Sequence, residues 1–120
     1  MKILPSGDLE VVAGEEITVK VVKSQRPYAA SIADLIGATW ETTNKPDDLT
    51  EVRSFRAPVA PGSRVFCGIV FDFAPDAGGA FDPDDKYTVE IKGNPAEDTR
   101  TSTIVPPPIV NRNFIFVVRG

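Results

Sequence analysis

The sequence predicts an all-β domain, folded as an antiparallel β-sandwich of about seven to eight strands with one short helical turn. In several short segments apolar residues occupy every second position, which is the period of a half-buried strand. Clusters of Gly, Pro, Asn and Asp separate these segments, and tight turns need these residue types. The chain has 120 residues, and neither a repeat nor a linker divides it. We therefore expect residues 1–120 to form a single β-sandwich domain.

Two short strands are expected near the amino terminus. Leu9–Val11 has apolar residues on either side of a glutamate, and Ile17–Val21 has them on alternate positions. The residues of Ala13–Glu15 lie between these segments, and their glycine suits a tight turn. The pattern therefore predicts two consecutive strands joined by a short turn.

The segment Ser31–Gly37 has a different spacing. Its apolar residues Ile32, Leu35 and Ile36 stand at positions i, i+3 and i+4, which lie on one face of a helix. The first serine suits an amino-terminal cap, and the last glycine suits the end of a helix. These features predict one short helical turn in a connection between strands.

The middle of the chain is expected to return to extended structure. Ala38–Thr43 is predicted to be a strand, and Asn44–Asp48 contains the Asn, Pro and Asp residues typical of a turn. Leu49–Ala57 is a weaker strand, because Val52 and Phe55 have opposite parity and need a bulge to face the same side. We therefore expect Leu49–Ala57 to lie at a sheet edge.

The second half contains the clearest strand. Val65–Phe73 is largely apolar on both of its alternating faces, which is typical of a central strand. The Pro, Gly and Asp residues of Ala74–Asp85 predict a loop. After the loop we expect an alternating strand at Tyr87–Ile91, an optional strand at Thr99–Val105 and a last strand at Asn113–Arg119.

The residues before the strand at Tyr87 carry a spaced pattern. Phe81, Pro83 and Tyr87 stand at i, i+2 and i+6, while Leu9–Val21 reads as strand, glycine turn and strand, and Trp40 follows. This combination resembles the immunoglobulin-like superfamily in its broad sense, including fibronectin type III domains. The resemblance implies an Ig-like sandwich without a disulfide, in which Tyr87 opens strand F and its hydroxyl bonds nearby backbone as a tyrosine corner. A different sandwich, such as a jelly roll, is the alternative.

Charge and residue content argue against several functional classes. The 17 acidic and 13 basic residues give a net charge of -4, which repels nucleic acid and anionic lipid. Histidine is absent and Cys67 is the one cysteine, so the commonest general base and any zinc site of several thiolates are missing. We expect no enzyme activity, no cofactor, no nucleic-acid partner and no membrane insertion, and we expect Cys67 to be buried.

The amino terminus gives an open prediction of location. It contains Lys2, but Pro5 and Asp8 interrupt any apolar segment of the length that a signal peptide needs. The expected location is cytoplasmic if Met1 is native, and extracellular or in an envelope if the chain is an excised domain.

Four aspartates in the predicted loop form a candidate metal site. Ca²⁺ takes several hard oxygen ligands, and the neighbouring Gly78 and Gly79 would let the backbone close around an ion. The spacing is not that of an EF-hand, and Asp and Gly are also ordinary turn residues, so a solvated loop is the interpretation we prefer. The candidate calcium ligands are Asp76, Asp82, Asp84 and Asp85.

Aromatic residues form a candidate carbohydrate site. Tyr28 and Trp40, with Arg26 nearby, would make a platform of the kind on which sugars stack. The alternative, which we prefer, is that Trp40 packs in the core of the sandwich and Tyr28 covers a loop.

Three arginines lie on or beside the expected edge strand. Arg53, Arg56 and Arg64 would either receive an acidic partner or protect the edge from pairing with another chain. Charged residues are a common means of protecting sheet edges, so protection is the interpretation we prefer.

Together these features favour a non-catalytic binding or structural module. Its loops or edge strand would contact another protein or a second copy of the chain, within an extracellular, envelope or virion assembly. A carbohydrate-binding module is the alternative, and a loop-presenting protease inhibitor is a further one. The absence of histidine makes an enzyme the last choice.

Overall fold

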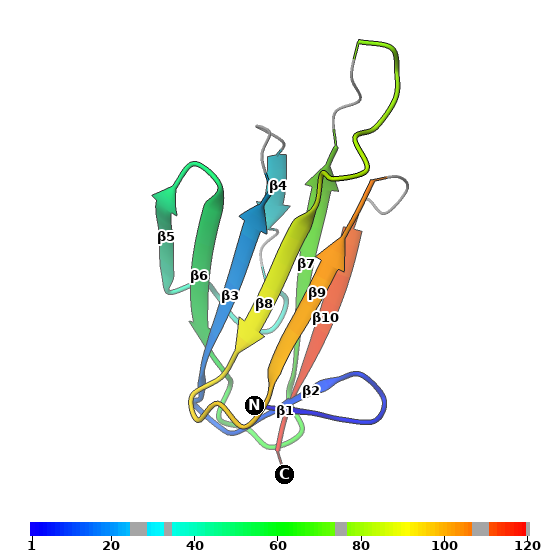
Figure 1. The fold of residues 1–120 in the computed structure, drawn as a ribbon. Helices are drawn as coiled ribbons and strands as arrows, with labels where there is room; N and C mark the ends of the chain where they lie inside the picture. The colour runs from blue at the N-terminus through cyan, green and yellow to red at the C-terminus, as the bar shows by residue number, and fades with distance from the viewer. Residues whose placement is uncertain (25–28, 33–34, 74–76, 107–110, 120) are drawn as a thin grey trace.

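The structure is a computed structural model that describes residues 1–24, 29–32, 35–73, 77–106 and 111–119. Within these residues the chain forms two five-stranded sheets that pack face to face as a β-sandwich (Figure 1). The molecule is elongated, with extents of 52 × 29 × 23 Å. The predicted all-β sandwich is therefore present.

The two sheets differ in their strand order. The first sheet has the order β1-β2-β10-β7-β4, and the second has the order β5-β6-β3-β8-β9. Neighbouring strands are antiparallel, except that β2 and β10 run parallel. The strands are β1 (Lys2–Ile3), β2 (Leu9–Val11), β3 (Glu16–Lys23), β4 (Ala29–Ile32), β5 (Thr42–Asp47), β6 (Thr50–Arg56), β7 (Arg64–Asp72), β8 (Tyr87–Lys92), β9 (Thr99–Ile104) and β10 (Asn111–Val118).

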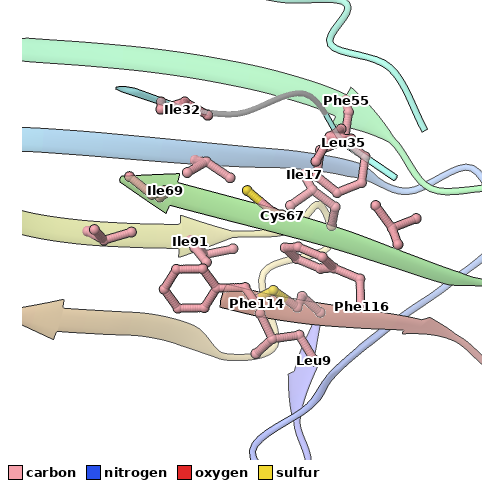
Figure 2. Packing of buried hydrophobic residues seen from close by; sticks show 14 of the residues in the cluster. Leu9, Ile17, Ile32, Leu35, Phe55, Cys67, Ile69, Ile91, Phe114 and Phe116 are labelled. Carbon is pink, nitrogen blue, oxygen red and sulfur yellow. The ribbon is translucent and has the colours of Figure 1, made fainter. Parts of the chain in front are cut away.

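One apolar core lies between the sheets (Figure 2). Successive side chains on a strand point to opposite faces, so alternate residues of each strand enter the core. Phe55 of β6 packs edge to face on Phe116 of β10, with ring centroids 5.2 Å apart, and this pair joins the two sheets. Other fully buried side chains are Tyr87, Leu9, Ile17, Ile69, Ile91, Ile104, Val11, Val19 and Val65.

Most of the predicted strands are confirmed. The alternating segments at the amino terminus, the clear strand in the second half and the last three strands correspond to β2, β3, β7, β8, β9 and β10. The described residues hold ten strands and not seven to eight, because the sequence pattern missed β1 and β4. With only two and four residues, these strands are too short to show a period.

The expected helical turn at Ser31–Gly37 is not seen at the described positions. Ser31 and Ile32 belong to β4, and Ile36 forms an antiparallel bridge with Phe66. Ile32 and Leu35 are buried in the core while Ile36 is exposed, so the three apolar residues do not share one face. Among the described residues no helix is long and apolar enough to cross a membrane.

The expectation that Leu49–Ala57 lies at a sheet edge is wrong. β6 has β5 on one side and β3 on the other, and its pairing with β3 continues without a bulge. The edge is formed by β5, which runs through most of the predicted turn at Asn44–Asp48. A register shift does occur, but it lies in β5 between Asn44 and Asp47.

The position of β8 also differs from the expectation. An Ig-like strand F lies beside the last strand, whereas β8 pairs with β3 and β9 in the other sheet. The strand beside β10 is β7. The residue pattern before Tyr87 therefore marks a buried tyrosine correctly, but its strand does not occupy the predicted place.

Tyr87 is fully buried and joins the two sheets. Its hydroxyl donates a hydrogen bond of 3.0 Å to the carbonyl oxygen of Asp72, at the end of β7. Its ring contacts Phe71 and Phe73, each with a centroid distance of 5.0 Å. The hydroxyl thus reaches across to the opposite sheet, where a tyrosine corner would bond within its own corner.

Candidate functional site

The outer face of β7 carries apolar residues that the fold leaves in contact with solvent. Val65, Cys67, Ile69 and Phe71 point into the core, so the alternate residues point outward. Of these outward residues, Phe66 is 40% exposed and Val70 is 51% exposed. The prediction of a central strand is confirmed for its pairing, because β10 and β4 flank it, but only one of its faces is covered.

Neighbouring strands extend this apolar surface on both sides of Phe66. Ile115 of β10 is directly opposite Phe66, and directly opposite residues of an antiparallel pair share a face. On the other side, Ile36 exchanges two backbone hydrogen bonds with Phe66, of 3.0 and 2.9 Å, and is 70% exposed. Ile36, Phe66 and Ile115 are called the apolar row below.

A glycine allows the segment of Ile36 to lie against β7. Gly37 has φ +98°, a left-handed conformation that L side chains rarely adopt. A Cβ at this position would overlap the carbonyl oxygen of Arg64, so the close approach requires glycine. The glycine read as the end of a helix is instead the residue that fixes Ile36 beside Phe66.

Arg64 is the cation next to the apolar row. It points outward from the start of β7, and Val117 of β10 lies opposite it. No ion pair joins Arg64 to another residue in the described part of the chain. An apolar surface with an adjacent guanidinium can bind an apolar side chain together with a carboxylate.

Arg53 and Arg56 do not mark an edge, because β6 is an inner strand. Arg53 lies opposite Val19 of β3, so it points toward the core side, and its Nε donates a hydrogen bond of 2.8 Å to Glu51. Arg56 is exposed, and its guanidinium lies 3.7 Å from Glu16 and 3.5 Å from Glu41. Arg64 is also on an inner strand, so none of the three arginines protects a sheet edge.

Trp40 is half-buried at the margin of the core. Its ring packs edge to face on Phe55 with a centroid distance of 5.6 Å, and the guanidinium carbon of Arg53 lies 5.7 Å from the ring centroid. The ring is therefore engaged by its own chain and does not form a flat exposed platform. Tyr28 and Arg26, the other members of the predicted platform, lie outside the described residues.

The predicted acidic loop uses one carboxylate to order its own backbone. Asp82 Oδ1 accepts a hydrogen bond of 2.9 Å from the amide of Asp84, and the Asp82 carbonyl accepts one of 3.1 Å from the amide of Asp85. Asp84 is exposed, whereas Asp85 is buried. Asp76 lies outside the described residues. Among the residues described, no group of three or more acidic or thiol side chains is arranged to hold a metal ion.

Cys67 is buried in the core, as expected. Burial raises the pKa of its thiol to about 12, while the positive charge of Arg53 acts in the opposite direction. The thiol therefore stays protonated at neutral pH, and a protonated thiol is a poor nucleophile.

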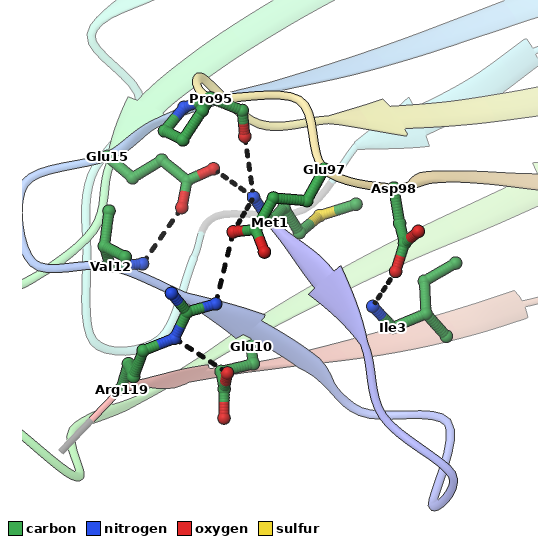
Figure 3. A network of polar contacts seen from close by, with 9 residues as sticks. All are labelled: Met1, Ile3, Glu10, Val12, Glu15, Pro95, Glu97, Asp98 and Arg119. Atoms are coloured by element: carbon green, nitrogen blue, oxygen red, sulfur yellow. Dashed lines mark hydrogen bonds and ion pairs between the residues drawn. The ribbon is translucent and has the colours of Figure 1, made fainter.

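A polar network holds the amino terminus (Figure 3), which lies at the lower end of the sandwich in Figure 1. The ammonium of Met1 donates to Glu15 Oε2 at 2.6 Å and to the carbonyl of Pro95 at 2.8 Å. The side chains of Met1 and Glu15 are both fully buried, and Glu15 Oε1 accepts a bond from the amide of Val12. A Cβ at Gly93 would overlap Glu15 and Met1, so glycine leaves the space for this pair.

Arg119 extends the network toward the surface. Its guanidinium donates to Glu10 at 2.8 Å and to Glu97 at 3.2 Å, and these bonds raise its pKa further above the ordinary value. Glu10, Glu15 and Glu97 each contact a cation of the same chain, which favours a structural role for the network.

The chain matches no known protein family, no curated protein and no solved structure.

The sequence did not lead us to predict the exposure of the apolar row. Both faces of Val65–Phe73 are apolar, and such a strand is ordinarily buried on both sides. The available signal was the absence of any long amphipathic helix that could cover the second face. That signal would have predicted an exposed apolar sheet surface.

Proposed function

We propose that the chain is a non-catalytic module that binds another protein through the apolar row and Arg64. The observation that carries this proposal is the exposure of Ile36 and Phe66 on a face where Ile115 continues the apolar surface. Contiguous exposed apolar surface is uncommon on soluble proteins and often marks an interaction site.

The chemistry of the surface supports a protein partner. Phenylalanine and arginine are enriched at protein interfaces, and a large apolar side chain in the centre of a contact contributes much of the binding energy. Phe66 occupies the centre of the apolar row, with Arg64 two residues away on the same face. The partner would present an apolar patch bordered by at least one carboxylate.

We infer further that the sandwich is an Ig-like variant. In Ig domains strand F lies between C and G, and strand E lies between B and D. Here β7 lies between β4 and β10, and β6 lies between β3 and β5, in the matching chain order. The hairpin β8–β9 would then be an insertion between F and G, placed on the free side of strand B. An Ig-like sandwich of this kind would serve mainly as a scaffold for binding.

Other functions have less support from the described residues. A carbohydrate platform needs exposed aromatic faces, and Trp40 is packed against Phe55 and Arg53. A cysteine nucleophile needs a thiolate, and burial keeps Cys67 protonated. The apolar row therefore favours protein binding over both.

The proposal is tested by changing the apolar row. Immobilised wild-type chain and the double variant Ile36→Ser/Phe66→Ser are each exposed to an extract of the source cells, and the retained proteins are compared. Because Phe66 and Ile36 are exposed, the variant should fold with nearly the same stability. A true partner should be retained by the wild type, and once purified it should bind the double variant at least about tenfold more weakly.

Val59→Ser provides the matched control. Val59 is 77% exposed, so the substitution removes a similar apolar group from a loop outside the apolar row. A partner that binds this variant normally and loses affinity for Arg64→Gln would support the proposed surface. Equal retention of all proteins by the wild type and the double variant would overturn it.

A further inference from the structure

We propose that β9 pairs edge to edge with β9 of a second copy of this chain, which makes the protein a symmetric dimer. β9 (Thr99–Ile104) is the last strand of its sheet and pairs with β8 alone in the described part of the chain. One residue before β9 begins, the amide of Asp98 donates to the carbonyl of Met1 at 2.9 Å, and the Asp98 carboxylate accepts a bond of 2.9 Å from the amide of Ile3 in β1. Apart from its start, where β1 lies close, the other side of β9 has no strand partner among the described residues.

The opposite edge of the same sheet has features that prevent such pairing. β5 contains Pro46, which has no amide hydrogen to offer a new strand. It also contains a register shift between Asn44 and Asp47, and irregular strands pair poorly with a straight neighbour. Lys45 adds a charge, which is a further common way to discourage pairing.

β9 has neither a proline nor a register shift, and it carries one charge, Arg100, on its inner side. Its pairing with β8 is regular from Thr99 to Ile104, and its sequence Thr-Arg-Thr-Ser-Thr-Ile contains no proline and one charge. Threonine is among the residues that favour extended structure. A regular, nearly uncharged edge strand is the kind to which another strand adds.

Strand parity limits how two copies can pair. Residues directly opposite must point to the same side of the sheet, so odd positions face odd positions. In the antiparallel register centred on Thr101, Thr101 faces its own copy and Thr99 faces Thr103. Each pair on the outer face is then Thr with Thr, a combination that stabilises antiparallel sheets.

The same register suits the charge of the strand. Arg100 lies on the inner side with Ser102, and in this register each Arg100 faces Ser102 of the second copy. A register shifted by two residues would place Arg100 against Arg100, which is unfavourable because the charges repel. The sequence is therefore self-complementary about Thr101, and this favours a second copy over a strand of an unrelated protein.

This dimer uses a different surface from that of the proposed function. The apolar row lies on the outer face of the first sheet, whereas β9 is the edge of the second. The two proposals can therefore fail independently: loss of dimerisation leaves the apolar row intact, and loss of partner binding leaves β9 unchanged.

The first test measures the oligomeric state. Sedimentation of the wild-type chain over a range of concentrations should show reversible dimerisation. Thr101→Lys places two lysines opposite each other across the dimer axis, so the dimer should weaken by about tenfold. In the monomer the new lysine would lie opposite Glu90, which compensates its charge, so folding should be unaffected.

The control is Asn44→Lys, which adds the same charge to the protected edge at β5 and should leave dimerisation unchanged. A wild-type chain that stays monomeric at all concentrations overturns the proposal, and so does a dimer that is indifferent to Thr101→Lys.

A second test reports the register. Thr101→Cys would place two thiols opposite each other, within reach of a disulfide after local adjustment, and should form a covalent dimer under mild oxidation. Thr103→Cys would face Thr99 and should cross-link much less. Cys67 is buried and should not interfere. Equal cross-linking of the two variants would overturn the register centred on Thr101.

Discussion

The hydroxyl of Tyr87 keeps its hydrogen bond although the ring is buried in the core. The ring lies between Phe71 and Phe73 in the core, where an unbonded hydroxyl would be costly. The bond to the Asp72 carbonyl satisfies it and joins β8 to the end of β7. The residue therefore links the two sheets at the base of the long connection between these strands.

Tyr87→Phe is expected to lower the free energy of unfolding by about 1 kcal/mol, because it removes this hydrogen bond and keeps the ring. Tyr87→Ala should lower it by about 3 to 5 kcal/mol, because the ring itself is lost from the core. Urea denaturation followed by circular dichroism measures both. An unchanged midpoint for Tyr87→Phe would show that the hydroxyl contributes nothing to stability.

Cys67 gives the stability a dependence on alkaline pH. Its thiol has a pKa raised from 9.0 to about 12 by burial, so the folded chain keeps a proton that the unfolded chain releases above pH 9. Stability is therefore present in full below pH 9 and is lost as pH rises toward 12, by up to about 1.4 kcal/mol per pH unit. Other groups also titrate in this range, so a variant is needed to isolate the thiol.

Cys67→Ala supplies that comparison. The variant should be less stable at pH 8, because it leaves a small cavity, but its stability should fall less steeply between pH 9 and pH 11. Urea midpoints at several pH values measure the difference. Parallel slopes for the two proteins would contradict the role assigned to the thiol.

At the scale of the element, β6 shows how a sheet accommodates charge on its core side. Phe55 enters the core, but Glu51 and Arg53, which precede it on the same side of the strand, form a hydrogen-bonded pair. Trp40 lies against both Phe55 and Arg53 and shields them from solvent on one side. The ring and the guanidinium therefore support each other's position.

Arg53→Ala should increase the exposure of Trp40, because it removes the guanidinium that lies near the ring. We expect a red shift of tryptophan emission, stronger quenching by acrylamide and a loss of about 1 to 2 kcal/mol of stability. Trp40 is the one tryptophan of the chain, so the signal has a single source. Arg56→Ala is the matched control, since Arg56 is exposed on the same strand, and an equal shift in both variants would refute the assignment.

The elements that the sequence predicted correctly are those with a long, regular period. β3 and β8 alternate apolar and polar residues over eight and six positions, and β7 and β10 are apolar runs of β-branched and aromatic residues, so local pattern alone identifies these four strands. A helical turn was predicted at Ser31–Gly37 because the core residues Ile32 and Leu35 have helical spacing, although Ile32 belongs to β4. The edge position of β5 was missed because Pro46 and the bulge resemble a turn, and an edge strand tolerates both.

The candidate site was less predictable than the fold. The exposure of Phe66 depends on whether another element covers the outer face of β7, and that is a property of the whole chain. The roles of Arg53 and Arg64 likewise depend on which strands pair with β6 and β7. Local periodicity does not specify the order of strands in a sheet. Partner choice among strands requires information from residues far apart in the sequence.

At the scale of the molecule, aromatic contacts join the sheets at two places. Phe55 meets Phe116 near one end of the core, and Tyr87 meets Phe71 in the other pair of strands. Each contact contains one ring from each sheet, so neither sheet can separate without losing both. This arrangement favours cooperative unfolding of the described sandwich as one unit.

The polar network lies at the end of the sandwich where β3 begins, near the Phe55–Phe116 pair. The ammonium of Met1, Glu15 from the turn before β3 and the carbonyl of Pro95 after β8 meet in a space that Gly93 leaves open. Since the ammonium and Glu15 are buried together, each charge depends on the other. A neutral side chain in place of Glu15 would leave the buried ammonium of Met1 without a counter-charge.

Glu15→Gln is therefore expected to lower the free energy of unfolding by about 3 kcal/mol, the typical effect of breaking a buried ion pair from one side. Glu97→Gln is the matched control, because Glu97 lies 3.9 Å from the same ammonium but is 41% exposed, and it should lower stability by less than about 1 kcal/mol. Urea denaturation of both variants of the 120-residue chain gives the comparison. If the two substitutions had equal effects, burial would not be the source of the stabilisation, and the network would act only as a set of solvated surface charges.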